Sequence, residues 1–322
     1  MNLVDLHCDT LSKLLKGKGS LVSNNLQVDL AGMKMAGTMV QFFACFVNAA
    51  AYEEHPLGVW DGAYEDVLRM ISRMEEETGK TEGIRIVRDE NQRKNATEKG
   101  IISAALTVEE GGVLKGNLER LEELYERGIR LMTLTWNYEN CIGFPNSADP
   151  EIMQKGLKPF GLEVVERMNE LGMIVDVSHL SDGGFWDCIH HSRVQVIASH
   201  SNARALCSHR RNLTDEMLRA LAEKGGVAGL NFYPLFLRND PRSTTLEDLA
   251  RHAAYMIRIA GEDVVAVGTD FDGFTAETED EYISHVREME RVWECLKRYG
   301  ITERQLDKIW SGNALRVIRN VW

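Results

Sequence analysis

The sequence of 322 residues predicts an α/β protein that folds as a closed (β/α)8 barrel, the TIM barrel. Eight short runs of β-forming residues alternate with segments of helical periodicity. Most of these runs are apolar without strict alternation, which is typical of parallel strands buried on both faces. The sequence also lacks the glycine-rich phosphate motifs G-x-G-x-x-G and G-x-x-x-x-G-K-S/T, which favours a barrel over an open, doubly wound sheet.

The expected elements can be placed along the chain by residue number. We expect strands at residues 3–8, 39–46, 101–108, 129–135, 173–178, 194–199, 226–231 and 264–269. We expect helices at residues 60–77, 117–127, 162–171, 215–224, 246–260 and 281–299. Several of these helices end at a glycine, such as Gly128 and Gly172, because glycine readily adopts the left-handed conformation that closes a helix. Residues 49–95 are long and irregular, so we expect a single domain over 1–322 with an insertion around 49–95.

The composition excludes some classes of partner. The net charge of −12 argues against nucleic acid and against an anionic membrane surface, because both need a basic face. The six cysteines are scattered without a C-x-x-C pair, which indicates reduced thiols rather than a disulfide framework. No signal peptide and no apolar run of about 20 residues is visible, so we expect a cytoplasmic protein that binds no membrane.

Potential metal ligands gather at the ends of the expected strands, where barrel enzymes place their chemistry. His7 and Asp9 end the first strand, and their spacing of two points both side chains to the same side. Taken alone, this pair is equally well explained as a structural histidine with a capping aspartate. Glu109 directly follows the third strand and is the better candidate there, whereas we expect Glu110 to be a solvated loop residue.

Two further strands end in histidine. His179 and His200 lie 21 residues apart, the length of one helix and one strand, so we expect them on neighbouring strands at the same height. The last strand ends near Asp270 and Asp272; one of them could be a ligand or a general base, and Asp270 is nearer the strand end. Three of the nine histidines thus fall at strand ends. We interpret the other six as surface or structural: His55, His190, His191, His209, His252 and His285.

Such a set of side chains indicates metal-dependent hydrolysis. Imidazole and carboxylate ligands without thiolates suit Zn²⁺, with Mn²⁺ or Co²⁺ as alternatives. Three histidines and two carboxylates exceed the three protein ligands of a mononuclear catalytic zinc, which favours two metals sharing a carboxylate. Paired metals can supply hydroxide near neutral pH and polarise a carbonyl, while Asp270 could move the proton of the leaving group. Strand alternation points Cys8 away from these ligands, so we expect it to pack in the core.

The motifs in their order resemble the membrane (renal-type) dipeptidases, peptidase family M19, and the likeness runs nearly end to end. The motifs that carry it are Asp5-Leu6-His7-Cys8-Asp9-Thr10, Val108-Glu109 with its glycines, Leu131-Met132-Thr133-Leu134-Thr135, Asp176-Val177-Ser178-His179, Ser199-His200-Ser201, Arg210-Arg211-Asn212 and Asp270-Phe271-Asp272-Gly273. The resemblance implies a metallo-dependent hydrolase barrel that cleaves dipeptides with a free C-terminal carboxylate by means of a metal-bridging hydroxide. Because the secretion signal and lipid-anchor tail of the animal enzymes are absent, the chain looks like a soluble microbial-type member. Family members often dimerise, so a homodimer is one expected assembly.

The resemblance also implies roles for single residues. His7 and Asp9 would bind one zinc, His179 and His200 would bind the second, and Glu109 would bridge the two ions. The ungapped spacing from the glutamate to the Thr133-Leu134-Thr135 strand selects Glu109 over Glu110. The final two roles concern the substrate: Arg211 would hold its terminal carboxylate, and Asp270 would transfer a proton. From the residues alone, an arginine in this position is more simply explained as solvated surface.

One departure from the family bears on the substrate. Trp136 stands where the animal members carry a substrate-binding histidine, and an indole cannot accept a proton. Trp136 is therefore a substrate-binding candidate that would change substrate preference. An alternative interpretation keeps the two metals but has them cleave a cyclic amide or an N-acyl amino acid. A third interpretation is a barrel that binds a metal or ligand without catalysis.

Overall fold

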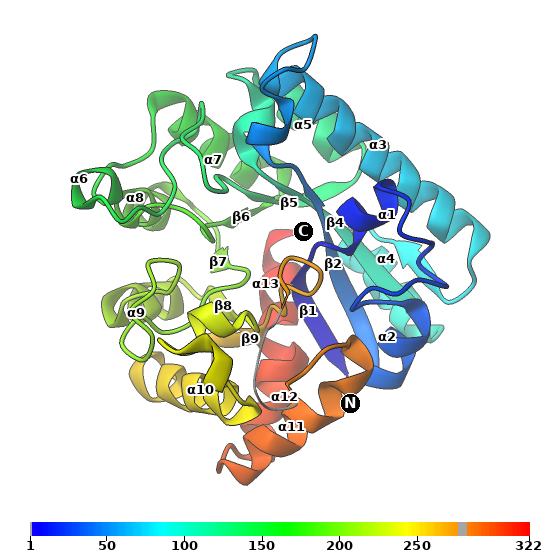
Figure 1. The fold of residues 1–322 in the computed structure, drawn as a ribbon, viewed down its shortest axis with the longest axis vertical. Helices are drawn as coiled ribbons and strands as arrows, with labels where there is room; N and C mark the ends of the chain where they lie inside the picture. Colours follow the sequence, from blue (N-terminus) through cyan, green and yellow to red (C-terminus); the bar gives the residue numbers. More distant parts are fainter. Residues whose placement is uncertain (1, 276–281) are drawn as a thin grey trace.

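The computed structural model describes residues 2–275 and 282–322, and within them eight parallel strands close into a ring (Figure 1). The strands are β1 (Leu3–Cys8), β2 (Thr38–Phe46), β3 (Ile84–Ile86), β4 (Ile102–Glu109), β5 (Ile129–Thr133), β6 (Ile174–Asp176), β7 (Val196–Ala198), β8 (Val227–Leu230) and β9 (Val265–Val267). All of them except β3 belong to the ring, in which β2 pairs with β4 and β9 pairs with β1. The predicted (β/α)8 barrel is confirmed, and each of the eight expected runs forms a ring strand.

Helices surround the ring and connect its strands (Figure 1). They are α1 (Thr10–Leu15), α2 (Leu30–Ala36), α3 (Val59–Lys80), α4 (Glu90–Glu98), α5 (Leu118–Glu126), α6 (Pro150–Met153), α7 (Pro159–Leu171), α8 (Asp182–His191), α9 (Asp215–Glu223), α10 (Leu246–Ala260), α11 (Met289–Arg298), α12 (Glu303–Asp307) and α13 (Asn313–Val321). The helix expected at 281–299 begins outside the described residues, and α11 starts at Met289 after a short 3-10 turn. Thr214 caps α9 by accepting a hydrogen bond from the amide of Met217.

The segment 49–95 is more regular than expected. It contains the 22-residue helix α3 and the three-residue strand β3, which pairs with the first half of β4, at Ile102 to Ala104. Strand β5 pairs with the second half of β4, from Leu106 to Glu109, so β3 extends the sheet beside the ring without entering it. The expectation of one domain with an insertion stays a prediction.

The barrel interior is filled with apolar side chains and closed by the C-terminal helix. Val4, Phe42 and Leu131 point inward and belong to the same cluster as Val317 of α13. The guanidinium of Arg316 donates to the carbonyl oxygens of Gly225 and Asp263, which lie two residues before the starts of β8 and β9. Helix α13 therefore lies at the N-terminal ends of the strands, and the C-terminal ends remain for the polar residues.

The ring closes between the first and last strands, where Asp5 is paired with Val267. The buried carboxylate of Asp5 reinforces this closure by accepting hydrogen bonds from the backbone amide and the hydroxyl of Thr269, at 2.9 and 2.8 Å. The amide of Asp270 also donates to the carbonyl oxygen of His7. Residues 264 positions apart in the sequence are thereby fixed side by side.

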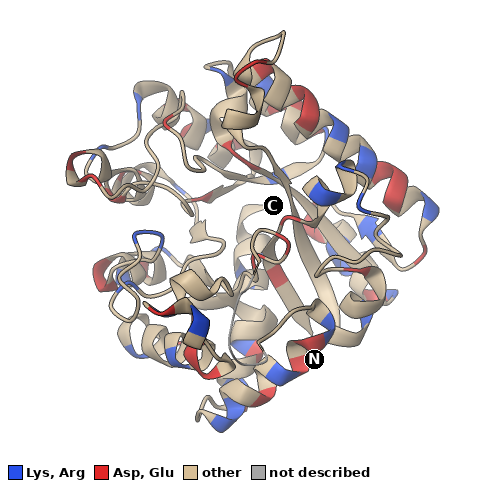
Figure 2. Ribbon diagram, in the orientation of Figure 1, with Lys and Arg blue, Asp and Glu red and all other residues tan. Residues whose placement is uncertain are grey.

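The outer surface carries mixed charge, with Lys and Arg interspersed among Asp and Glu along helices such as α3 (Figure 2). Within the described ranges, no helix has both the length and the apolar character needed to cross a membrane. All six cysteines are free thiols, in agreement with the expected absence of a disulfide framework. Cys8 packs in the apolar layer between strands and helices, as its place on β1 predicts.

Candidate metal centre

Five predicted ligands meet at the C-terminal end of the barrel, with Glu109 in the middle. His7 lies in β1, Glu109 ends β4, and His179 and His200 follow β6 and β7. The Oε2 atom of Glu109 lies 3.4 Å from Nε2 of His7. Its Oε1 atom lies 3.0 Å from Nε2 of His179 and 3.6 Å from Nε2 of His200. One carboxylate thus faces histidines from two sides, which is the arrangement expected of a bridging ligand.

Two more carboxylates approach from the side of β1 and β9. Nε2 of His7 lies 3.5 Å from Oδ2 of Asp9 and 3.8 Å from Oδ1 of Asp270. Ligand atoms of His7, Asp9 and Asp270 lie within 4.8 Å of one another, as do those of His7, Glu109 and His200. Asp270 adopts a left-handed backbone, with φ 61°, which turns its side chain toward this group. Asp270 therefore has the position of a ligand as well as that of a proton carrier.

The donor atoms of this cluster fit a metal ion. His7 Nε2, Asp9 Oδ1 and Glu109 Oε1 are buried and make no hydrogen bond, although buried polar groups normally find a partner. The cluster offers imidazole nitrogen and carboxylate oxygen without a thiolate, the set that suits zinc and related divalent cations. Buried imidazole and carboxylate atoms that converge on one point without hydrogen-bond partners are the arrangement that a metal ion satisfies.

The three histidines lie in two different electrostatic environments. Burial opposes protonation of His7, but the carboxylates of Glu109 and Asp9 outweigh it, and the pKa of His7 lies well above its usual value. Burial, together with the nearby positive charge of Arg211, lowers the pKa of His179 and His200 well below the usual value. His179 and His200 are therefore neutral, the form in which imidazole binds metals.

The same burial acts in the opposite direction on the carboxylates. It raises the pKa of Glu109 to about 7 and that of Asp270 to about 6, because charged carboxylates lose their hydration in the closed site. Asn231 offsets part of this cost at Asp270 by donating a hydrogen bond of 2.9 Å to Oδ2. A carboxyl group whose pKa lies near neutrality can both accept and return a proton.

His200 and His179 are held through their Nδ1 atoms by residues to which the sequence analysis gave no role. Ser199 Oγ lies 2.7 Å from Nδ1 of His200 and donates to the buried carboxylate of Asp176 at 2.6 Å. Asn137 Oδ1 lies 3.3 Å from Nδ1 of His179. Such contacts fix the orientation of a ligating imidazole. The signal available in the sequence was the position of Asp176, at the end of β6 and three residues before His179.

Arg211 is buried, so the interpretation of a solvated surface arginine is wrong. Its side chain donates to Ser201 Oγ and to the carbonyl oxygen of His200, both at 3.2 Å, while its Nε has no hydrogen-bond partner. Burial lowers the pKa of Arg211 to about 10, which leaves it protonated at neutral pH. The neighbouring Asn212 anchors the loop by donating to two backbone carbonyls, of Cys207 and Phe236.

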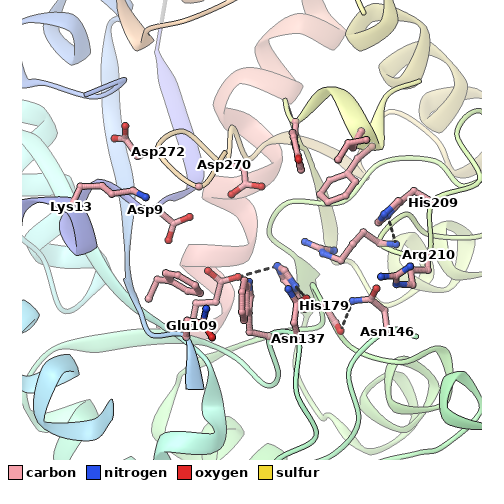
Figure 3. A pocket seen from close by; sticks show the side chains of 18 residues that line it. Asp9, Lys13, Glu109, Asn137, Asn146, His179, His209, Arg210, Asp270 and Asp272 are labelled. Carbon is pink, nitrogen blue, oxygen red and sulfur yellow. Dashed lines mark hydrogen bonds and ion pairs between the residues drawn. The ribbon is translucent and has the colours of Figure 1, made fainter. Parts of the chain in front are cut away.

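These residues surround a cavity of about 350 Å³ (Figure 3). Asp9, Glu109, Asp270 and His179 lie toward its centre, and His209 and Arg210 lie on one side. Arg211, the residue after Arg210, is also part of the lining. The cavity lining also includes Lys13, Phe46, Asn48, Trp136, Asn137, Asn146, Tyr233, Leu235, Phe236, Asp272 and Gly273. A central group of candidate metal ligands with two arginines in the lining suits a small anionic substrate.

Two other expectations about single residues need correction or extension. Glu110 is fully buried, so the solvated loop residue expected at this position is wrong. His209, interpreted as surface or structural, lines the cavity, and burial lowers its pKa to about 4. Trp136 lies in the cavity wall as a substrate-binding residue would, with its ring 4.9 Å from Phe46 and 6.2 Å from His179.

Comparisons with known proteins agree with this geometry. The family model described as membrane dipeptidase, peptidase family M19, matches residues 1–322. An uncharacterized protein of the pqqA 5′ region of Klebsiella pneumoniae is 39% identical over 234 residues, 70% of this chain and 84% of the relative. An uncharacterized dipeptidase of Schizosaccharomyces pombe is 31% identical over 296 residues, 90% of this chain and 71% of the relative. A crystal structure of a Rhodobacter sphaeroides metallo-peptidase, liganded with a phosphinate mimic of L-Ala-D-Ala, matches 100% of this chain and 99% of its own, at 25% identity and a TM-score of 0.88.

Proposed function

Because this chain belongs to the membrane dipeptidase family, peptidase family M19, and is thus a metallo-dipeptidase, we propose that it cleaves dipeptides with a free C-terminal carboxylate at a pair of zinc ions. His7 and Asp9 would hold one ion, His179 and His200 would hold the second, and Glu109 would bridge them. The observation that carries this proposal is the convergence of both histidine groups on Glu109, with buried donor atoms that make no hydrogen bond.

Arg211 is proposed to bind the substrate carboxylate. It is buried and protonated, lies beside His200, and keeps an Nε–H without a partner. A guanidinium can hold a carboxylate through two parallel hydrogen bonds, and a closed site strengthens them. Because Arg211, Glu109 and His179 line the same cavity, a dipeptide held at Arg211 would place its peptide carbonyl toward Glu109 and His179.

Asp270 is proposed to carry the proton. When bound, the metal ions would supply an activated water molecule at neutral pH and polarise the scissile carbonyl. Asp270 would take a proton from the attacking water and return it to the leaving amine. Asn231 holds one oxygen of Asp270 at 2.9 Å, which leaves the other free to face the substrate.

The test combines metal analysis with a dipeptide panel. We expect about two zinc ions per chain, hydrolysis of L-L or L-D dipeptides, loss of activity on chelation and recovery on adding zinc. The matched control is the C-terminal amide of each dipeptide, which lacks the charge that Arg211 would bind and should be cleaved far more slowly. Zinc-loaded protein that leaves a broad panel intact would overturn the proposal.

The second candidate function rests on Trp136, whose indole stands in the cavity wall. An apolar wall would accept an acyl group or a ring in place of a free N-terminal amino group. Hydrolysis of N-acyl amino acids or cyclic amides, without hydrolysis of dipeptides, would favour this amidohydrolase function. A zinc-loaded protein that binds such compounds but converts none would favour a barrel without catalysis.

A further inference from the structure

Glu110 presents a buried carboxylate with no cation to balance it. It follows Glu109 directly and is 0% exposed. Its backbone has φ 112°, an unusual value for a residue other than glycine. Among the described residues, no basic nitrogen forms an ion pair with it. Burying a carboxylate without a counter-ion costs free energy, so the hydrogen bonds of Glu110 must offset that cost.

Those hydrogen bonds join two loops at the mouth of the barrel. Oε1 of Glu110 accepts from the amide of Gly112, at 2.8 Å, and from the side-chain amide of Asn140. Oε2 accepts from the backbone amide of Trp136, at 3.0 Å. The same Asn140 amide group also donates to the carbonyl oxygen of Leu134, at 2.9 Å. Two of the three donors to Glu110, the amide of Trp136 and the side chain of Asn140, belong to the loop after β5, so the carboxylate bonds the loop after β4 to the loop after β5.

The glycines after Glu110 allow this close approach. A Cβ atom at Gly111 would lie 2.7 Å from the carbonyl oxygen of Leu134, and one at Gly112 would lie 2.9 Å from Cβ of Asn140. Neither distance is compatible with an L side chain, so the two loops can meet only across glycine. The Glu110 carboxylate lies at this contact, where Oε1 accepts from two of the three donors and Oε2 accepts from the third.

The bonded amide belongs to the residue whose ring lines the cavity. Trp136 packs against Phe46 with ring centroids 4.9 Å apart, and its indole is only partly buried. A side chain in a cavity wall is placed by its own backbone as well as by its packing. We propose that Glu110 is a positioning residue, which holds the Trp136 backbone so that the indole keeps its place in the substrate cavity. The kinetic consequence rests on the proposed dipeptidase function, whereas the structural consequence does not.

The first test measures the loop without any substrate. In Glu110→Ala, we expect backbone amide hydrogen exchange in residues 134–143 to become at least about tenfold faster, because a tenfold change corresponds to about 1.4 kcal/mol of lost protection. In Glu110→Gln, the exchange rate should lie between those of the wild type and Glu110→Ala, since the amide nitrogen of glutamine would face a donor and only its oxygen can accept. The control is Glu77→Ala, which removes another buried glutamate that accepts a backbone N–H, from Leu21, outside the site. Unchanged exchange in Glu110→Ala overturns the proposal.

The second test asks whether Glu110 acts through Trp136. In the zinc-loaded protein, we expect Glu110→Ala, or Glu110→Gln where the alanine variant does not fold, to lower kcat/KM for dipeptides about tenfold. The same substitution should cost less than about threefold when Trp136 is already alanine, because coupled residues are not additive. Equal losses in both backgrounds would contradict the assignment, as would loss of bound metal in the single variant.

The two tests also separate this inference from the proposed function. A wild-type protein that hydrolyses no dipeptide would refute the dipeptidase function, and hydrogen exchange alone would then decide the role of Glu110. A wild-type protein that hydrolyses dipeptides, together with equal losses in the double-variant comparison, would refute the positioning role while leaving the proposed function intact.

Discussion

His252 should make the stability of this barrel sensitive to mild acid. The imidazole lies in α10 and is 0% exposed. Its Nδ1 accepts a hydrogen bond from the amide of Ala203, at 3.2 Å, and its Nε2 contacts the carbonyl oxygen of Leu237, at 3.0 Å. Burial lowers its pKa from 6.5 to about 4. A proton added at Nδ1 would remove the acceptor that holds the loop leading to Arg211.

The size of the effect follows from the two pKa values. The pKa of His252 is depressed in the folded state, so its contribution to stability is complete above pH 6.5 and is lost as the pH falls toward 4. At about 1.4 kcal/mol per pH unit, protonation of His252 in the unfolded chain should lower the free energy of unfolding by about 3 kcal/mol when the pH falls from 7 to 4. About 2 kcal/mol of that loss should be present at pH 5.

Urea unfolding of the metal-free protein at pH 7 and pH 5 measures this contribution. His252→Gln removes the titrating group, so the stability difference between wild type and variant should shrink by about 2 kcal/mol on acidification. Working without metal avoids the separate loss of metal at low pH. His191→Gln, which changes an exposed imidazole, controls for the removal of a histidine as such. A stability difference that stays constant within about 0.5 kcal/mol would refute this reasoning.

Three other changes have definite expected outcomes. Arg211→Met should lower kcat/KM for dipeptides about 100-fold, because a charge-assisted hydrogen-bonded pair contributes about 3 kcal/mol. The kcat/KM for the C-terminal amides of the same dipeptides should not change, and an equal loss on both substrates would contradict carboxylate binding. Asn137→Ala should weaken metal affinity about 10- to 100-fold in chelator competition, because His179 loses the partner of its Nδ1; unchanged affinity would contradict this role. Asp176→Asn should lower the urea-measured stability by about 2 kcal/mol, because Asp176 accepts from Thr133 and from the amide and hydroxyl of Ser199; a loss below about 0.5 kcal/mol would contradict it.

The eight ring strands could be predicted because each carries its own signal, a short apolar run followed by a helix. The same regularity placed His179 and His200 at one height, since one helix and one strand separate them. Strand β3 has only the three residues Ile84, Arg85 and Ile86, too few to show a period. It becomes a strand because β4 offers it a partner along Ile102 to Ala104.

The residues misjudged from the sequence are those whose burial depends on distant loops. Glu110 is buried because Gly111 allows the loop that contains Leu134 to approach, and no residue near Glu110 in the sequence predicts that contact. Arg211 is covered because Asn212 ties its loop to Phe236, 24 residues away in the chain. Charged residues in polar loops are usually solvated, so local sequence favours the wrong environment in both cases.

The closure of the ring at Asp5 gives the candidate metal centre a second consequence, for the stability of the barrel. His7 and Asp9 lie on one side of the β1–β9 seam, and Asp270 lies on the other. A cation bound by these residues would link β1 to the segment after β9. Because a ligand that binds only the closed barrel also stabilises the closed barrel, this cation would stabilise the ring. Metal affinity and barrel integrity are then two measures of one equilibrium. Opening of the seam would release the ion, and loss of the ion would loosen the seam.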